Sequence, residues 1–528
     1  MPLRWIERSA ARCLSIAALP PCLPSRDPAK AGRDPPAVVF SSHIFVYYFL
    51  PLVLLGYYAL ARAPQRWRNF WLILTGYTFY GWAEPRFMPL MFATTFVDWL
   101  VSLIIAHDTW RFWRVLRKPV QRLPRSTSRT RTQRHAILIS VLLNLATLGF
   151  FKYFNFGIES YNALIQAFGL EHAQFDTFFR VVLPLGISFY TFQALSYTID
   201  VYRGEAEAMA NFIDFSCFVS MFPHLVAGPI LKFSFLAEQL KHRVLTSDKF
   251  ARGVAFFMLG LAKKILLANP CGKIADVAFD AGSIGTLDAW FGSLGYAFQI
   301  YFDFSGYSDM AIGLGLMFGF VFAKNFDSPY CSESITDFWR RWHISLSTWL
   351  REYLYVPLGG NRRGTRRTYL NLVVTMLLGG LWHGASWNFV IWGGLHGGML
   401  AFERSQGREG FYHNLPRPFR IGFTFLIVLL GWVFFRASDL PRALEYLASM
   451  FGFGHAQPGA ALLSGILYKP YYLLSIGIAA LVVWAGRQTW DWTQNMSLPR
   501  TALCFALGWL ALVVLATQEY NPFIYFIF

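Results

Sequence analysis

The sequence predicts an all-α protein that crosses a membrane about 11 to 13 times, with re-entrant or interfacial helices between the crossings. Three observations support this fold class. Hydrophobic residues make up 55% of the 528 positions and charged residues only 15%, a balance that soluble domains rarely show. Apolar segments recur along most of the chain. Aromatic residues reach 18%, as expected where aromatic side chains contact lipid and gather at membrane interfaces.

The charge and cysteine content exclude several other classes of protein. The net charge is +17, but the basic residues lie in short segments between apolar spans, which is typical of cytoplasmic loops and not of nucleic-acid binding. The six cysteines are scattered without paired spacing, so neither a zinc site nor a disulfide framework is indicated. We expect no metal site, no bound cofactor and no nucleic-acid partner.

Residues 1–38 differ in composition from the rest of the chain. They are rich in arginine and proline, and their apolar run at 13–19 is too short to span a bilayer. We expect an extension that is disordered or results from a misassigned start. Residues 39–528 are expected to form a single membrane domain.

The predicted spans follow one another with short connections. Several are shorter than the ~20 residues that a crossing helix needs, so we expect broken or re-entrant helices among them. The apolar segments lie at 44–61, 70–82, 87–105, 136–151, 181–199, 212–226, 254–267, 290–302, 308–322, 369–382, 387–402, 421–435, 471–484 and 501–517.

Loop charge predicts the orientation of these spans. The segments at 62–68, 111–134 and 362–367 are strongly basic and are expected on the cytoplasmic side. The segments at 154–180 and 274–288 carry mainly acidic residues and are expected on the outside.

His383 is the leading candidate for a functional residue. It lies inside the apolar stretch 375–392, where an ionisable side chain is costly and therefore suggests a function. Imidazole titrates near neutral pH and can accept or donate a proton. A histidine that only bridges two helices is the alternative interpretation.

The segment 334–353 combines tryptophans with basic and hydroxyl side chains. Arg340, His343, Ser347 and Arg351 recur at three or four residues and are expected to share one helical face. Two interpretations remain open: an amphipathic helix at the membrane interface, or a helix that dips into the membrane and presents His343 and its cations to an anionic donor. Ser334 or Thr336 is the expected N-cap.

Asp303 and Asp309 place two carboxylates within an apolar region. We consider both as substrate-binding candidates, together with Arg340 and Arg351. The alternative is that the carboxylates form salt bridges with the arginines of the 339–351 segment. Gly315 and Gly319 have the spacing that allows close helix packing.

Four blocks of sequence in this order resemble the membrane-bound O-acyltransferase family, in particular its bacterial polysaccharide branch. The blocks are 222–230, 301–315, 334–362 and 375–398, and the similarity runs from about residue 39 to about residue 454. The motif Trp-Arg-Arg-Trp-His-Ile-Ser-Leu-Ser-Thr-Trp-Leu-Arg at 339–351 is the most specific part. The resemblance implies that His383 is the catalytic intramembrane histidine and that His343 is the second family histidine.

The resemblance also implies a function. Such a protein would move an acetyl group from a cytoplasmic thioester donor, expected to be acetyl-CoA, across the bacterial inner membrane toward exopolysaccharide O-acetylation, with alginate as the expected polymer. Periplasmic acetyltransferases would be its partners, and the lipid bilayer its surroundings. The alternatives are another polysaccharide such as cellulose or peptidoglycan, D-alanyl transfer to teichoic acid, or a proton-coupled transporter in which the histidine relays protons.

Overall fold

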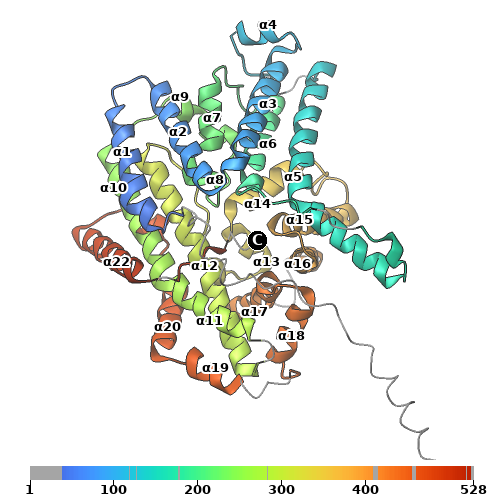
Figure 1. The fold of residues 1–528 in the computed structure, drawn as a ribbon, viewed down its shortest axis with the longest axis vertical. Helices are drawn as coiled ribbons and strands as arrows, with labels where there is room; N and C mark the ends of the chain where they lie inside the picture. Colours follow the sequence, from blue (N-terminus) through green and yellow to red (C-terminus); the bar gives the residue numbers. More distant parts are fainter. Residues whose placement is uncertain are drawn as a thin grey trace, which may run out of the picture. The chain divides into compact units, whose positions relative to one another are not determined.

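The computed structural model describes residues 39–117, 119–125, 128–175, 179–281, 284–407, 414–454, 460–518 and 520–524 (Figure 1). This part of the chain is helical and contains no β-strand. The extension predicted at 1–38 lies outside the described residues.

The first half of the chain forms short and long helices joined by connections of different lengths. They are η1 (Phe45–Phe49), α1 (Leu50–Ala59), α2 (Gln65–Ala83), η2 (Pro85–Phe87), α3 (Met88–His107), α4 (Phe112–Arg117), α5 (Arg131–Ala167), η3 (Glu171–Ala173), α6 (Ile187–Arg203), α7 (Phe212–Ser220), α8 (Phe222–Leu225), α9 (Phe233–Lys241) and α10 (Ser247–Ala262).

The second half of the chain contains the remaining helices. Its elements are η4 (Lys263–Ala268), α11 (Asn269–Asp280), α12 (Thr286–Met317), η5 (Pro329–Cys331), α13 (Ile335–Arg341), α14 (Ile344–Leu350), η6 (Arg351–Tyr355), α15 (Thr365–His383), α16 (Trp387–Gln406), α17 (Arg417–Arg436), α18 (Leu440–Met450), α19 (Ala460–Leu467), α20 (Pro470–Trp484), α21 (Thr489–Trp492) and α22 (Leu498–Thr517).

The described residues confirm the predicted fold class of an all-α membrane protein. Four of their helical segments are long and apolar enough to cross a membrane, namely Pro85–His107, Arg131–Ala167, Arg417–Arg436 and Leu498–Thr517. Two shorter apolar helices, Phe45–Ala59 and Pro470–Trp484, join them. The number of crossings stays a prediction, because helices such as α15 and α16 are rich in glycine and buried polar groups and do not stand out by hydropathy.

The helix α5 is longer than the span predicted at 136–151. It starts at a capping box in which Thr130 accepts a hydrogen bond from the Gln133 backbone and Gln133 bonds back to the Thr130 backbone. It then continues for 37 residues to Ala167. Much of the acidic segment expected as an external loop is therefore helical, since no proline or αL glycine interrupts it before Gly169.

The helix α12 is a single element where two spans were predicted, at 290–302 and 308–322. The polar residues in the middle of α12 are buried, and their carboxylates pair with lysines of the neighbouring element η4. The helix therefore continues through them. Lys264 lies 2.8 Å from Asp303, and Lys263 lies 2.7 Å from Asp309. These ion pairs offset the cost of burying the two carboxylates, so α12 can continue without a break at this point.

Close packing of α10 on α12 depends on glycines that the sequence analysis did not single out. A Cβ at Gly313 would lie 2.6 Å from the Gly253 carbonyl oxygen, and a Cβ at Gly306 would lie 2.7 Å from the Gly260 carbonyl oxygen. The predicted pair was Gly315 and Gly319, and this prediction was wrong. Gly319 follows the end of α12 at a φ of +85° and acts as a helix terminator.

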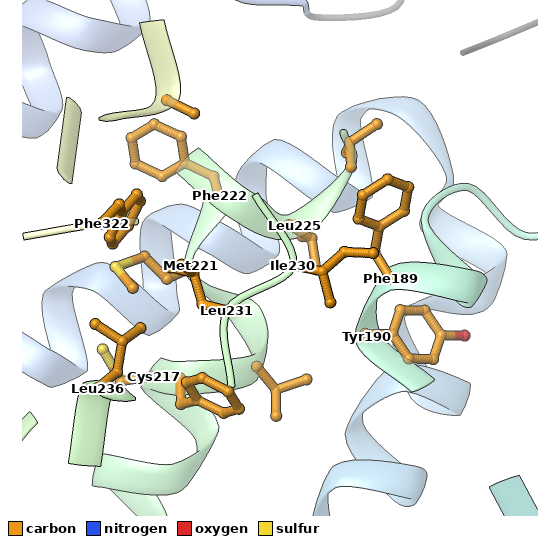
Figure 2. Packing of buried hydrophobic residues seen from close by; sticks show 14 of the residues in the cluster. Phe189, Tyr190, Cys217, Met221, Phe222, Leu225, Ile230, Leu231, Leu236 and Phe322 are labelled. Carbon is orange, nitrogen blue, oxygen red and sulfur yellow. The ribbon is translucent and has the colours of Figure 1, made fainter. Parts of the chain in front are cut away.

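The segment after α7 is broken, as the prolines and glycines of 222–230 indicated. Figure 2 shows its apolar side chains, with Leu225 and Ile230 lying between Phe222 on one side and Phe189 of α6 on the other. The short α8 and the irregular residues after it are almost fully buried. Backbone of this kind is tolerated at membrane depth only where protein covers it.

The basic segments that precede α5 and α15 lie at the same end of the fold. Arg122, in the first, donates a hydrogen bond of 2.9 Å to the carbonyl of Gly204 at the end of α6. The neighbouring Arg203 donates at 3.2 Å to the carbonyl of Glu352, in η6, which leads into the second. That both segments face the cytoplasmic side of the membrane stays a prediction.

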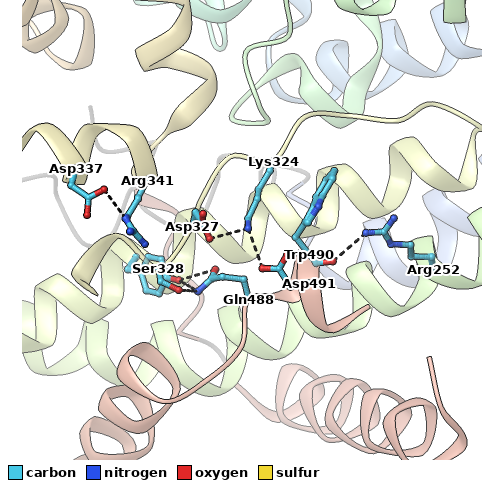
Figure 3. A network of polar contacts seen from close by, with 10 residues as sticks. Arg252, Lys324, Asp327, Ser328, Asp337, Arg341, Gln488, Trp490 and Asp491 are labelled. Carbon is cyan, nitrogen blue, oxygen red and sulfur yellow. Dashed lines mark hydrogen bonds and ion pairs between the residues drawn. The ribbon is translucent and has the colours of Figure 1, made fainter. Parts of the chain in front are cut away.

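A polar network joins the segment after α12 to the turn before α21 (Figure 3). Lys324 lies 2.9 Å from Asp327 and 3.1 Å from Asp491, and Gln488 donates to Ser328 at 2.8 Å. These contacts fix the extended residues that follow α12. That segment carries Asn325, which contacts the candidate site.

Candidate active site

The helices α15 and α16 form a tight hairpin that places His383 at its turn. A Cβ at Gly380 would lie 2.1 Å from the Phe389 carbonyl oxygen, and a Cβ at Gly393 would lie 2.4 Å from the Met376 carbonyl oxygen. Glycines therefore let the two backbones touch, which is the small-residue packing of membrane helices. His383 is the last residue of α15, so this contact fixes its position.

Gly393→Ala is expected to destabilise the protein by about 1–3 kcal/mol, because the added methyl group cannot fit against the α15 backbone. The change should lower the thermal unfolding midpoint of the purified protein in detergent, together with its activity. Gly394→Ala is the matched control, since its Cβ would meet only a Leu377 methyl at 3.7 Å. Equal midpoints for the two variants would contradict the close-packing argument.

Aromatic rings surround the side chain of His383. Ring centroids lie at 5.0 Å for Trp382, 5.2 Å for Trp392 and 5.2 Å for Phe435. The ring borders a cavity of about 10 Å³, which is the size of one water molecule. Among the residues that the structure describes, no side chain or backbone group forms a hydrogen bond with the ring nitrogens of His383. Its nitrogens are therefore available to a substrate.

His343 does not lie on the predicted continuous helical face. The helix ends with α13 and restarts with α14, and His343 sits between them at a φ of +43°. The segment after α12 holds this break: Asp327 N–H donates to the Arg341 carbonyl at 2.9 Å, and Ile344 N–H donates to the Asn325 carbonyl at 2.9 Å. The break turns His343 into the core, where its side chain is fully buried.

Asn325 determines which nitrogen of His343 carries the proton. The Oδ1 atom of Asn325 accepts from the Ser345 backbone N–H at 3.2 Å, so it is an acceptor. The Nδ1 atom of His343 lies 3.2 Å from the same oxygen, and because the Ser345 hydroxyl already donates to that oxygen at 2.8 Å, the arrangement is satisfied when Nδ1 donates to it as well. Its Nε2 then carries a lone pair, and no described residue contacts it through a hydrogen bond. A buried imidazole with a free lone pair can act as a general base.

The two predicted histidines lie close together. The ring centroids of His343 and His383 are 6.5 Å apart, although the residues come from different elements. Phe304 packs edge-on against His343 at 4.6 Å and also lines the cavity beside His383. His383 thus borders this small apolar cavity, the chamber, while His343 packs against Phe304 of its wall and does not itself line it.

The predicted cations Arg340 and Arg351 line a separate, larger cavity of about 450 Å³, together with Arg404 of α16. Ser347 and Trp339 contribute to its wall. The helical face predicted from the 340–351 spacing therefore exists, except that His343 is turned away from it. Three guanidinium groups around one cavity suit a polyanionic ligand.

This cavity lies next to the histidine chamber. Trp339 lines the cavity, and its ring centroid lies 5.7 Å from that of Trp392. Trp392 in turn lies 5.2 Å from His383. Two adjacent indole rings thus separate the cationic cavity from the catalytic candidates.

Asp303 and Asp309 are placed away from the cationic cavity. Asp303 also accepts from the Ile524 backbone N–H at 2.9 Å, and Asp309 accepts from the Thr489 hydroxyl at 2.7 Å. Their partners are lysines of η4 and not the arginines that the alternative interpretation named. In this arrangement the carboxylates join α12 to η4, to Thr489 of α21 and to Ile524, and their role in substrate binding stays a prediction.

Three residues near the site were missed in the sequence analysis. Arg404 lies at the end of a span and gave no separate signal. Asn325 lies in a connecting segment, and no spacing relates it to His343. Lys152 gave a signal that was overlooked: it is an ionisable residue next to an apolar span, and its ammonium donates to the carbonyl oxygen of Trp382.

The chain is similar to known proteins over most of its length. The model of the membrane-bound O-acyltransferase family matches residues 202–409, which include both histidines and the cationic cavity. The chain is 42% identical to a probable alginate O-acetylase of Azotobacter vinelandii over 93% of this chain and 100% of the relative.

Two further relatives extend the comparison. A probable alginate O-acetylase of Pseudomonas aeruginosa is 48% identical over 79% of this chain and 75% of its own length. A peptidoglycan O-acetyltransferase of Helicobacter pylori is 36% identical over 79% of this chain and 80% of its own length. The chain belongs to the membrane-bound O-acyltransferase family and is a multi-pass membrane O-acyltransferase.

Proposed function

We propose that the protein moves an acetyl group from acetyl-CoA on the cytoplasmic side of a bacterial inner membrane toward the O-acetylation of alginate. The cationic cavity beside the buried histidine pair carries this proposal. The names of the relatives from Azotobacter and Pseudomonas support alginate as the polymer. Periplasmic acetyltransferases that complete the modification are the proposed partners.

The position of the cavity supports a cytoplasmic donor. Arg351 and Tyr355 of η6 line it, and η6 leads into the basic segment before α15. That segment lies at the same end of the fold as the basic segment before α5. Lysine and arginine near membrane spans are retained on the cytoplasmic side, which is where acetyl-CoA is made.

The proposed chemistry assigns separate tasks to the two parts of the site. The arginines of the cavity bind the phosphates of coenzyme A, and the thioester end reaches past Trp339 toward the chamber. His383 accepts the proton of the acceptor hydroxyl as its oxygen attacks the thioester carbonyl. The thiolate of coenzyme A leaves and takes up that proton, so the histidine is regenerated. His343 assists through its free Nε2.

Complementation tests the proposal as a whole. The chain is expressed in an alginate-producing bacterium that lacks its own O-acetylase, and the O-acetyl content of the exported alginate is measured. We expect the chain to restore acetylation in these cells. In inverted membrane vesicles of the same strain, we expect acetylation to require added acetyl-CoA. Unacetylated alginate would contradict alginate as the polymer.

The same vesicles distinguish the alternatives. Vesicles are also prepared from a host that makes cellulose or peptidoglycan. Acetylation of that polymer, with none of alginate, would indicate another polymer as the substrate. A requirement for a D-alanyl carrier protein would indicate teichoic acid modification. Flux driven by a proton gradient without consumption of acetyl-CoA would indicate a transporter.

Arg340→Ala is expected to raise the KM for acetyl-CoA about tenfold with little change in kcat, because a charge-assisted contact to a phosphate is lost outside the chamber. Initial rates in inverted vesicles at varied acetyl-CoA give both constants. Arg341→Ala is the matched control: Arg341 is adjacent in sequence but pairs with Asp337 at 2.9 Å and does not line the cavity. An unchanged KM in Arg340→Ala would remove the cavity from donor binding.

A further inference from the structure

Two neighbouring side chains of α5 contact the carboxyl end of α15. The ammonium of Lys152 donates to the Trp382 carbonyl oxygen and lies 3.3 Å from the His383 carbonyl oxygen. The hydroxyl of Tyr153 donates to the Leu381 carbonyl oxygen at 2.9 Å. In Figure 1, α5 passes beside α15, although the contacting residues are about 230 positions apart in the chain.

These contacts complete the hydrogen bonding of the helix end that carries His383. The last carbonyl groups of an α-helix have no donor within the helix. Gly384 N–H closes the final turn on the Gly380 carbonyl at 3.3 Å. The three carbonyls beyond it, of Leu381, Trp382 and His383, receive their donors from Lys152 and Tyr153. In a membrane, no water replaces such donors.

The charge of Lys152 suits this position. An ammonium group among apolar helices is costly unless it finds partners, and the carboxyl end of a helix carries partial negative charge. Lys152 also lies 5.7 Å from the ring centroid of Trp382, within the range of a cation–π contact. Besides the two carbonyl groups, its ammonium also donates to the Ser188 hydroxyl of α6 at 3.4 Å. The lysine thus contacts both the backbone and the ring that adjoin His383.

We propose that Lys152 and Tyr153 are positioning residues that hold the last turn of α15 and thereby direct the His383 ring into the chamber. This inference rests on the proposed function, which makes His383 the catalytic base. The donor cavity is lined by α13, α14, η6, α15 and α16 and not by α5. The two residues should therefore affect turnover and not donor binding.

The first test is a kinetic one in inverted vesicles supplied with acetyl-CoA. Lys152→Met should lower kcat roughly 10- to 100-fold, since small displacements of a reacting group cost rates of this size, and should leave the KM for acetyl-CoA unchanged. Lys152→Arg should recover much of the rate because a guanidinium also donates to two carbonyls. Tyr153→Phe should cause a smaller loss.

A matched control separates positioning from general loss of a lysine contact. Lys249 also donates to two carbonyls near a helix end, those of Val244 at 3.1 Å and Gly319 at 3.3 Å, but it lies outside the site. Lys249→Met should keep the parental kcat. If Lys152 only filled space, Lys152→Met would be at least as active as Lys152→Arg, and the proposal would fail.

Hydrogen–deuterium exchange gives a second readout that a general folding defect would not produce. In Lys152→Met, backbone exchange should rise in the peptide around Gly384 and stay at the parental level elsewhere. A rise along the whole chain, or a parental kcat in Lys152→Met, would overturn the positioning role. If His383→Ala also kept full activity, the proposed function would fail instead, because no catalytic ring would need positioning.

Discussion

Replacing His383 with alanine is expected to lower acyl transfer by about 10²–10⁴-fold, which is the range that a positioned general base contributes. The ring borders the small chamber and bonds to no described residue, so its loss leaves no buried polar group unsatisfied. The variant should therefore insert and accumulate like the parent. The O-acetyl content of exported alginate and the rate in inverted vesicles measure the effect.

Two companions make this result interpretable. His383→Asn keeps a polar side chain of similar size but no basic ring, and it should be as inactive as the alanine variant. His135→Ala removes an exposed histidine of α5 and should behave like the parent. Near-normal acetylation in His383→Ala would exclude this histidine as the base.

His343→Ala is expected to have the second-largest effect, with activity reduced about 10²-fold. The reason is that its Nε2 has no hydrogen-bond partner among the described residues and that its ring centroid lies 6.5 Å from that of His383. Removing parts of this arrangement should give a graded series. Asn325→Ala should lose less activity than His343→Ala, because the ring stays but is no longer oriented.

The far end of the same network supplies the control. Ser308 accepts from the Asn325 amide at 2.9 Å, on the side away from the histidine, so Ser308→Ala should have the mildest effect. Rates per folded molecule, with the thermal unfolding midpoint measured for each variant, test the order. Equal rates for His343→Ala and the parent would show that this histidine contributes to packing and not to catalysis.

The sequence predicted the fold class and His383 for the same physical reason. Burying an ionisable side chain or an unpaired backbone group in the membrane is costly. Membrane spans therefore stand out in the sequence as apolar helical segments, and an ionisable residue inside such a segment stands out as well. The same reasoning applied to Lys152 would have identified it too. The predicted span was ended at Phe151, one residue before it, although the helix continues to Ala167.

What the sequence could not show depends on contacts between distant segments. The polar stretch from Asp303 to Asp309 indicated a break between two spans, because nothing local compensates its two carboxylates. Their lysine partners are about 40 positions earlier in the chain, on η4. His343 was assigned to the wrong face for a similar reason, since the αL break that turns it inward is held by the segment after α12.

The glycine prediction failed because spacing alone does not identify a packing partner. Gly315 and Gly319 have the expected separation, but Gly319 lies beyond the end of α12. Gly306 and Gly313, seven residues apart, face Gly260 and Gly253 on the neighbouring helix. Which glycines allow close approach is decided by the face that the partner helix covers.

The backbone contact between α15 and α16 has a consequence for the motions that the site allows. Gly380 and Gly393 each pack against a carbonyl group of the facing helix, and this contact holds His383 at a fixed place within the α15–α16 hairpin. Carriers that work by alternating access rock one half of the molecule about a fixed site. The close contact between α15 and α16 leaves no room for a rocking motion of one of these two helices against the other.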